Sequence, residues 1–179
     1  MTRWSLLDPA TTTGRTRTLL DAIATKRGRV PVMIRALGQS PAALAAYTAF
    51  GAAMSQAELP AALRERIAIA VAEANGCRTC RAAHTHFGRG EGVPEAELLA
   101  ARHATSSDAR TTAALAFAMT VMRGIGHVSD AELTAVREAG FSDGAIMEIV
   151  ATVFINVFTN AVNHVAETDP DEWPGPEVP

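Results

Sequence analysis

Four residues of types that carry proton or sulfur chemistry lie close together in this 179-residue chain. The only two cysteines, Cys77 and Cys80, are three residues apart, with Glu73 four residues before the first and His84 four residues after the second. A thiolate with a second thiol in reach can attack an oxidant and then close a disulfide. The spacing therefore predicts a dithiol–disulfide site, with a histidine and a carboxylate available for proton transfer.

A break in helical structure is expected between Glu73 and the cysteines. Asn75-Gly76 is a pair that reverses the chain, and glycine is common just past the end of a helix. We predict one helix that ends near Ala74 and another that begins at about Cys77.

This arrangement gives each of the four residues a place. Cys80 lies in the first turn of the second helix, where free N–H groups and the helix dipole favour a thiolate, and Arg78 and Arg81 add positive charge. Residues three or four apart share a helix face, so His84 is expected to reach the sulfur of Cys80. Glu73, at the end of the preceding helix, is expected to orient His84 or to relay a proton through water.

Two other interpretations use the same residues. Cys77 and Cys80 are also suited to an ordinary buried position in a core. Cys77, Cys80 and His84 supply three potential zinc ligands, with Glu73 or His86 as a fourth. Structural zinc sites usually draw their ligands from two separated segments, whereas these lie in one short stretch, so redox chemistry is the stronger interpretation.

The segment Glu73–Gly88 resembles the active-site motif of the alkylhydroperoxidase D-like branch of the carboxymuconolactone decarboxylase superfamily. Three further stretches are similar to the family, and the resemblance covers roughly residues 15–168. These stretches are Val30–Leu37 with Ser40-Pro41, Leu63–Ile69 and Phe158–His164. Two features differ from the alkylhydroperoxidase D proteins proper. Thr79 stands where they have a histidine between the cysteines, and their glutamate lies further upstream than Glu73.

By position, the resemblance implies that Cys80 attacks a peroxide, that Cys77 resolves the product as a disulfide, and that His84 and Glu73 form a proton relay. It implies a thiol-dependent peroxidase that reduces hydroperoxides and needs no metal and no organic cofactor. An external dithiol of lipoyl or thioredoxin-like type would restore the thiols. The resemblance also implies an all-α fold and a homo-oligomer, either a trimer or a hexamer.

Two other functions stay open at this stage. The first is a lactone decarboxylase of the same superfamily, whose chemistry does not depend on a cysteine pair, so that activity surviving Cys80→Ser would favour it. The second is a non-enzymatic, redox-sensing helical oligomer whose disulfide changes its packing. Peroxide turnover with a recycled reductant separates an enzyme from such a sensor.

The rest of the chain predicts an all-α fold in a single compact domain with eight or so helices. No segment shows a two-residue alternation flanked by hairpin turns. Helix-start signals recur instead, at Ser40-Pro41, at the capping box Ser129–Glu132 and at Ser142. The expected division is an N-terminal arm over 1–14, a helical domain over 15–168 and a C-terminal tail over 169–179. A weak internal repeat, which lays His84 on His164, would make two similar helical halves.

Composition argues against several classes of function. The net charge of −3 gives no basic surface for nucleic acid, and no block of like charge suggests an anionic membrane surface. Met1–Pro9 has no apolar run suited to a signal peptide. The most apolar region, Ala145–Val165, is interrupted by polar residues, so a buried helix is expected rather than a membrane span. Two cysteines three apart are not a disulfide framework, so we expect a reducing, cytoplasmic location.

Overall fold

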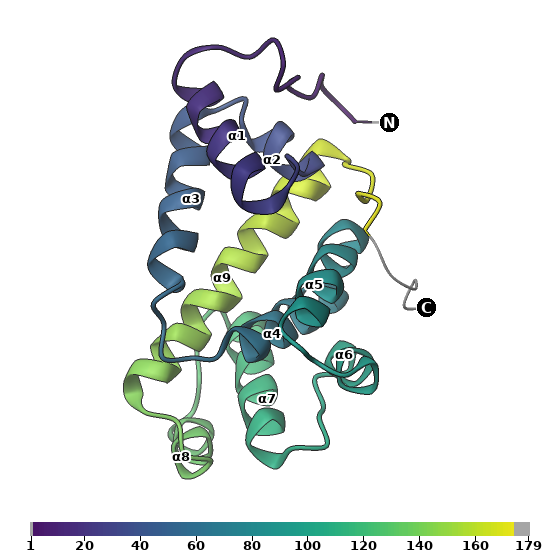
Figure 1. Cartoon of the computed structure of the whole chain (residues 1–179). Coiled ribbons are helices and arrows are strands. Elements are labelled where there is room, and N and C mark those ends of the chain that lie inside the picture. Colours follow the sequence, from purple (N-terminus) through teal and green to yellow (C-terminus); the bar gives the residue numbers. More distant parts are fainter. Residues whose placement is uncertain (1, 174–179) are drawn as a thin grey trace.

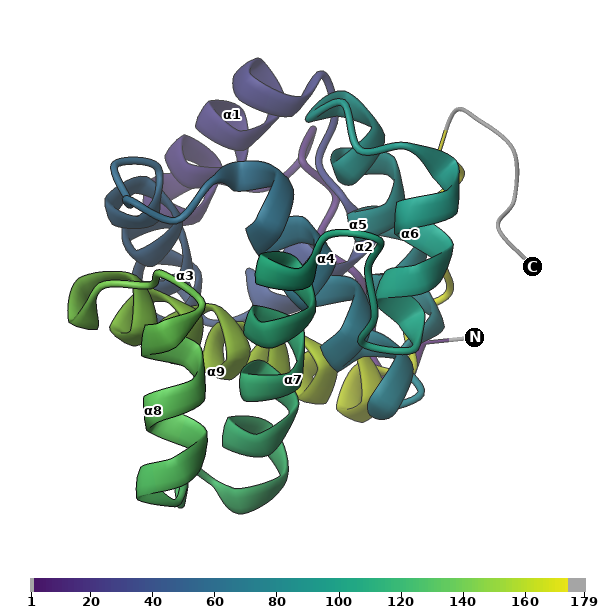
Figure 2. The same cartoon turned by 90° about the horizontal axis from the view of Figure 1, so that it is seen from below.

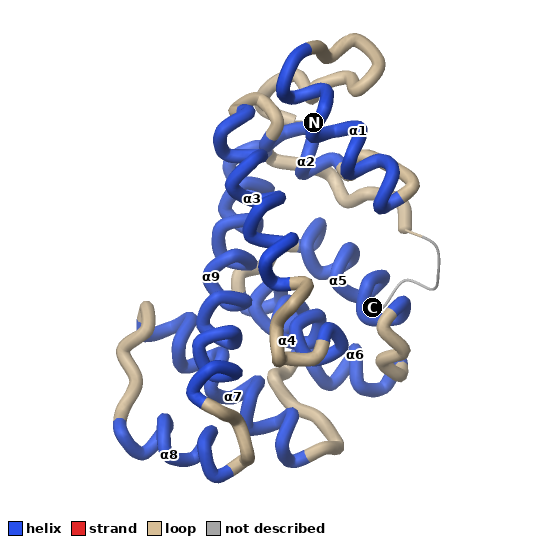
Figure 3. Tube along the Cα trace, turned by 60° about the vertical axis from the view of Figure 1, so that its left-hand side comes forward, coloured by secondary structure: helices blue, strands red, loops and turns tan. Residues whose placement is uncertain are grey.

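The computed structural model describes residues 2–173, which form nine α-helices and no strand (Figures 1 and 3). The helices are α1 (Gly14–Arg27), α2 (Val32–Leu37), α3 (Pro41–Met54), α4 (Ala61–Ala74), α5 (Arg78–Gly90), α6 (Glu95–Arg102), α7 (Ala109–Gly124), α8 (Asp130–Glu138) and α9 (Asp143–Ala166). The predicted all-α, single-domain fold is confirmed.

Short polar side chains start the helices where the sequence signals predicted. The side chains of Ser40 and Ser142, at predicted starts, each accept a hydrogen bond from the backbone N–H three residues later, and Asp108 does the same at the start of α7. Ser129 and Glu132 form the predicted capping box at the start of α8. Each of these bonds satisfies an N–H group that would otherwise lack a partner in the first helical turn.

Helix α9 is the central element, and it packs against α2, α4, α5 and α7 (Figure 1). By length and composition alone, α9 is apolar enough to cross a membrane. Within the fold, however, Ile146, Ile149 and Val153 are buried in the main hydrophobic cluster, together with residues of α4 and α7. Each such side chain stabilises the fold by about 1.5–3 kcal/mol relative to an exposed position. These contacts make α9 a core helix, as the interrupted apolar pattern predicted.

The first three helices form a second packing group at one end of the molecule (Figures 1 and 2). Leu20, Ile34, Leu37 and Leu44 make a hydrophobic cluster of their own. In this group, α1 and α2 both pack on α3, and α2 also packs on α9. The two packing groups therefore have separate apolar clusters, and α9 contributes to the packing of both groups.

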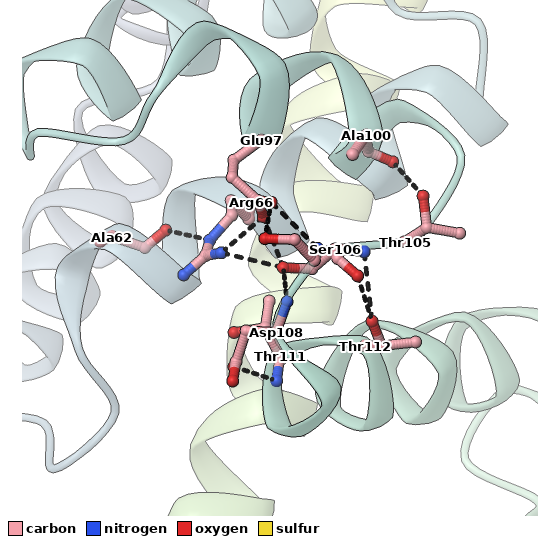
Figure 4. A network of polar contacts seen from close by, with 10 residues as sticks. Ala62, Arg66, Glu97, Ala100, Thr105, Ser106, Asp108, Thr111 and Thr112 are labelled. Atoms are coloured by element: carbon pink, nitrogen blue, oxygen red, sulfur yellow. Dashed lines mark hydrogen bonds and ion pairs between the residues drawn. The ribbon is translucent and has the colours of Figure 1, made fainter.

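A polar network fixes the connection between α6 and α7 to the side of α4 (Figure 4). Nη1 of Arg66 lies 3.2 Å from Oε2 of Glu97. The hydroxyl of Ser106 donates to the same carboxylate, and the backbone N–H of Ser107 donates to its other oxygen at 2.9 Å. These bonds, with that of Ser106 the strongest, lower the pKa of Glu97 to about 2. Glu97 therefore acts as a charged acceptor that holds three elements together.

The N-terminal segment, residues 2–13, contains no helix but lies against the rest of the chain. The backbone N–H of Arg3 donates to the carbonyl oxygen of Ala166, and that of Leu7 donates to Arg35. The predicted arm is thus bound by hydrogen bonds to both α2 and the end of α9.

The C-terminal segment, residues 168–173, also docks on its own chain, and we call it the C-terminal strap. The side chain of Asp171 accepts from Nη2 of Arg29 at 2.6 Å and from the backbone N–H of Val32 at 3.0 Å. The sequence predicted a C-terminal tail over 169–179, and up to Trp173 this segment docks on the same chain. The remainder of the predicted tail, 174–179, lies outside the described residues.

Candidate functional site

The two cysteines lie at the start of α5, as predicted. Helix α4 ends at Ala74, and Gly76 has a φ of 68°, a left-handed conformation that favours glycine. Cys77 is then the N-cap of α5, and its sulfur accepts a hydrogen bond from the backbone N–H of Cys80 at 3.3 Å. The two sulfurs form a disulfide, with Cα atoms 5.4 Å apart. This Cα separation is ordinary for a bridge, so the backbone accommodates the oxidised pair.

Asn163 of α9 is a direct neighbour of the sulfur pair. Its Nδ2 lies 3.0 Å from Sγ of Cys80 and 3.8 Å from Sγ of Cys77. Its Oδ1 accepts from the hydroxyl of Thr168, whose carbonyl oxygen accepts from the hydroxyl of Thr79 at 2.9 Å. These bonds hold the amide with its N–H side toward Cys80. A buried donor at this distance favours a thiolate over a thiol.

Asn163 is a site residue that was not predicted from the sequence. A signal was present, because an asparagine in an apolar, buried helix requires a hydrogen-bond partner. The partner could not be found from the sequence, since 83 positions separate Asn163 from Cys80.

His84 lies one turn after Cys80 on α5, and its carboxylate partner is Glu65 of α4. Nδ1 of His84 is 2.7 Å from Oε2 of Glu65, and both side chains are about one-fifth exposed. A carboxylate on Nδ1 fixes the ring orientation and leaves Nε2 to exchange protons. Cys80, His84 and Glu65 all line the same cavity. The structure therefore brings together three groups able to carry out thiol chemistry with proton transfer.

The structure does not bring Glu73 to His84. Glu73 binds Nη1 of Arg81 at 2.9 Å and Nε of Arg102 at 2.8 Å. The hydrogen bond from Arg102, supported by Arg81, holds the pKa of the Glu73 carboxyl below its usual value. Glu73 is thus an ionised residue that ties the end of α4 to α5 and α6, and it does not line the cavity.

The reason for this difference is the packing of α4 against α5. The chain reverses at Asn75-Gly76, and the two helices then pack along each other as a helical hairpin. Residues further along α5 therefore meet residues further back along α4. Cys77 lies beside the end of α4, and His84 meets Glu65.

A cavity of about 690 Å³ opens beside Cys80. Its walls come from α1, α2, α3, α4, α5 and α9 and from the C-terminal strap, and they are mostly apolar. Tyr47, Phe50, Phe87 and Trp173 supply aromatic surface. Pockets of roughly 300–1,000 Å³ with a few polar groups suit small organic ligands. Cys77 is not part of the lining, so Cys80 is the cysteine that a ligand in this cavity meets.

The potential zinc ligands are dispersed in the structure. Among residues 2–173, no three His, Cys, Asp or Glu side chains gather to hold a metal ion. His86 stacks on the indole of Trp173 with ring centroids 4.8 Å apart, while His84 and Glu73 have the partners described above. The alternative of a zinc site therefore lacks a ligand cluster in the described part of the chain.

Comparison with known proteins agrees with this fold. Residues 41–123 match the sequence model of the Carboxymuconolactone decarboxylase family. An uncharacterised peroxidase-related protein from Ralstonia eutropha JMP134, described as an alkylhydroperoxidase AhpD core, is 24% identical with a TM-score of 0.86, over 96% of this chain and 93% of that chain. A peroxidase-related protein from Silicibacter sp. TM1040 is 25% identical with a TM-score of 0.79, over 93% and 92% of the two chains.

A third solved structure with this fold is that of a debrominase. The debrominase Bmp8 is 21% identical with a TM-score of 0.76, over 93% of this chain and 90% of that chain. A cysteine-to-alanine variant of Bmp8 has been solved with 2,3,4-tribromopyrrole. No curated protein sequence matches this chain significantly. Residues 41–123 thus carry the sequence pattern of the carboxymuconolactone decarboxylase family, in a chain with the AhpD-like fold, which confirms the family resemblance seen in the motif.

Proposed function

We propose that this protein is a thiol-dependent peroxidase that reduces organic hydroperoxides. One observation carries the proposal: Cys80, at the N-terminal end of α5 and hydrogen-bonded by Asn163, lines a largely apolar cavity together with the His84–Glu65 pair. The helix terminus and the amide donor both favour the thiolate, which is the attacking form of a cysteine.

In the proposed reaction, the reduced Cys80 thiol gives its proton to Nε2 of His84, whose ring is held by Glu65. The thiolate sulfur attacks the terminal oxygen of the hydroperoxide, the O–O bond breaks, and an alcohol leaves with the proton returned by His84. Cys80 is then a sulfenic acid. The Cys77 thiol attacks the Cys80 sulfur, and a disulfide and one water molecule form.

An external dithiol is needed to complete the cycle. Thiol–disulfide exchange with it would return Cys77 and Cys80 to thiols and oxidise the donor to its own disulfide. We propose a lipoyl-type or thioredoxin-like donor, as the family resemblance implies. Assembly as a trimer or hexamer likewise stays a prediction.

The cavity supports an organic hydroperoxide over hydrogen peroxide. Hydrogen peroxide offers no apolar surface to a cavity of this size, whereas an alkyl or aryl group gains about 25 cal/mol for each Å² of apolar surface buried. An organic substrate therefore makes use of the aromatic and aliphatic walls beside Cys80.

Intact mass and free-thiol counts after one equivalent of an alkyl hydroperoxide test the proposal. We expect the reduced wild type to lose both thiols. We expect Cys77→Ser to hold a sulfenic acid on Cys80 that dimedone traps, and Cys80→Ser to keep its remaining thiol. Thiols that stay reduced in the wild type would exclude a peroxidase. Oxidation without turnover on an added dithiol would favour a redox sensor, and lactone decarboxylation surviving Cys80→Ser would favour the decarboxylase.

The similarity to a debrominase favours a second candidate function, reductive dehalogenation of a halogenated aromatic compound. The aromatic lining of the cavity suits such a ring. The Cys80 thiolate would take the halogen, the ring carbon would take a proton, and Cys77 would displace halide to form the same disulfide. Halide release from a bromopyrrole, measured beside hydroperoxide consumption, decides between the two substrates.

A further inference from the structure

Three cationic side chains line the cavity beside Cys80, namely Lys26, Arg27 and Arg64. None of them forms an ion pair within residues 2–173. Both carboxylates of the lining are already engaged, Glu65 by His84 and Asp171 by Arg29. The cavity therefore has positive charge that the described chain does not neutralise.

Arg64 differs from the other two cations in its burial. Lys26 and Arg27 are exposed, and the guanidinium of Arg27 lies over the ring of Phe87, 4.9 Å from its centroid. Arg64 is half-buried, and its one hydrogen bond within the described residues runs from Nη1 to the carbonyl oxygen of Leu59 at 3.0 Å. A guanidinium has five N–H donors in a planar fork that matches a carboxylate. Most of the donors of Arg64 are therefore available to an anionic group in the cavity.

Arg64 and Cys80 lie toward opposite ends of the cavity. Two contacts show that helices α4 and α9 run in the same direction. Just before α4, the backbone N–H of Leu59 donates to Glu148 in the early part of α9, and just after α4, the side chain of Asn75 donates to Asn160 in the later part. Arg64, near the start of α4, is accordingly level with the early part of α9.

The lining residues of α9 give the length of the cavity. One face of α9 lines the cavity, and it carries Thr152, Asn156, Thr159 and Asn163. Asn163 marks the end that holds Cys80, and Thr152 lies eleven residues earlier, which is about 16 Å along the helix axis.

We propose that the cavity binds amphipathic organic acids, with the carboxylate on Arg64, the apolar body along α9 and the reactive group at Cys80. This inference rests on the proposed function for the reaction, since it names the class of hydroperoxide that the enzyme reduces. Binding itself does not depend on that reaction. The ligand class is a monocarboxylate with an apolar chain or ring system long enough to extend from Arg64 toward Cys80.

Trp173 gives a binding signal that is independent of the thiols. The chain has two tryptophans, and Trp4→Phe leaves only Trp173, which lines the cavity. In a Trp4→Phe, Cys80→Ser protein, the fluorescence of Trp173 is titrated with dodecanoic acid and with its methyl ester. We expect the acid to bind at least about tenfold more tightly than the ester, as hydrogen bonds to a charged group would give.

Arg64→Gln in the same background should remove the preference for the acid while leaving ester binding unchanged. Arg123→Gln is the matched control, because Arg123 is exposed on α7 and is not part of the cavity lining. Unchanged thermal unfolding midpoints establish that each variant is folded. Equal binding of acid and ester by the parent protein, binding of neither, or a preference that persists in Arg64→Gln would overturn the inference.

Oxidation of the thiols by neutral cumene hydroperoxide, in proteins that retain both cysteines, separates this inference from the proposed function. We expect rapid oxidation in the wild type and the same rate in Arg123→Gln, since Arg123 is not part of the cavity lining. A slow reaction in both proteins would count against the peroxidase and would leave the binding result standing.

Discussion

Glu65 and Glu73 lie on the same helix but hold different parts of the molecule. Glu65 binds His84 at the cavity, whereas Glu73 binds Arg81 and Arg102 away from it. The same substitution at the two positions therefore separates proton transfer from structural support, because glutamine keeps the shape of the side chain and removes its charge.

We expect Glu65→Gln to slow oxidation of the thiols by an alkyl hydroperoxide by about 10²-fold, the low end of the effect of a general acid–base group. Glu73→Gln should leave that rate within a factor of about two and instead lower the free energy of unfolding by about 1–3 kcal/mol, since two arginines lose a charged partner. Stopped-flow oxidation and urea unfolding of both variants check this. A slow Glu73→Gln enzyme with normal stability would restore Glu73 as the relay carboxylate.

Asn163 offers a second test at the level of a single residue. Replacing it with aspartate puts a negative charge in place of the N–H donor that lies 3.0 Å from the Cys80 sulfur. We expect alkylation of the reduced Cys80 at neutral pH to slow by at least about tenfold, since a hydrogen bond to a charged group contributes about 1.5–3 kcal/mol.

The pH dependence of iodoacetamide alkylation in a Cys77→Ser background measures the effect of Asn163→Asp. Asn160→Asp is a control on the same helix. Asn160 binds Asn75 and, within the described residues, forms no hydrogen bond to either sulfur. An unchanged alkylation profile in Asn163→Asp would show that the amide does not stabilise the thiolate.

The sequence predicted the cysteine pair and His84 more reliably than the carboxylate. Cys77, Cys80 and His84 belong to one short helix start, so local spacing determines their relation. The partner of His84 depends on how α5 packs back along α4, which is a tertiary contact. Glu73 was expected to reach His84 from the end of the preceding helix, but the packing of α5 back along α4 brings Glu65 to His84 instead.

At the scale of the elements, helix boundaries followed local signals and the connections between helices did not. Serine caps, a capping box and Gly76 marked the predicted starts and the break, and the structure places helix ends at these positions. The junction of α4, α6 and α7 instead depends on Glu97, which had no special signal beyond its place in the first turn of a helix.

Glu97→Gln should destabilise this junction. Glutamine keeps the shape but loses the charge that accepts from Ser106, Ser107 and Arg66, so we expect a loss of about 1–3 kcal/mol in the free energy of unfolding at neutral pH. Glu95→Gln on the same helix is the control. Glu95 pairs with Arg89 at an exposed position, and such surface pairs contribute about 0–1 kcal/mol.

The effect of Glu97 should depend on pH in a defined direction. Its pKa is lowered from 4.5 to about 2 in the folded protein, so its stabilisation is fully present above about pH 4.5 and is lost as the pH falls toward 2. The difference in urea midpoint between wild type and Glu97→Gln should therefore shrink across that range. A difference that is constant from pH 7 to pH 3 would contradict the ionised, hydrogen-bonded state of Glu97.

At the scale of the whole molecule, the cavity is assembled from parts that are distant in the sequence. Six helices and the C-terminal strap line the cavity beside Cys80, and no local pattern indicates that α1 and α9 share a wall. Apolar periodicity predicted which faces are buried but not the space left between them. For the same reason the sequence did not indicate that residues 168–173 would cover the site of their own chain.

The strap gives the last prediction. Asp171 anchors it, because this nearly buried side chain binds both Arg29 and the backbone N–H of Val32, while Thr168 and Trp173 contact the site at either end. Asp171→Asn removes the charge from both bonds. We expect at least about tenfold faster hydrogen exchange at residues 169–173, since charge-assisted bonds contribute about 1.5–3 kcal/mol each.

Exchange in α4, α7 and α9 should be unchanged in Asp171→Asn, because the core clusters do not involve the strap. Glu172→Gln is the matched control, since Glu172 is the next residue and is exposed. With the strap loosened, Cys80 should also become more accessible. Iodoacetamide should therefore alkylate reduced Asp171→Asn faster than reduced Glu172→Gln. Equal exchange at residues 169–173 in the two variants would mean that the aromatic contacts of Trp173 with His86 and Phe87, rather than the ion pair of Asp171, hold the strap over the cavity.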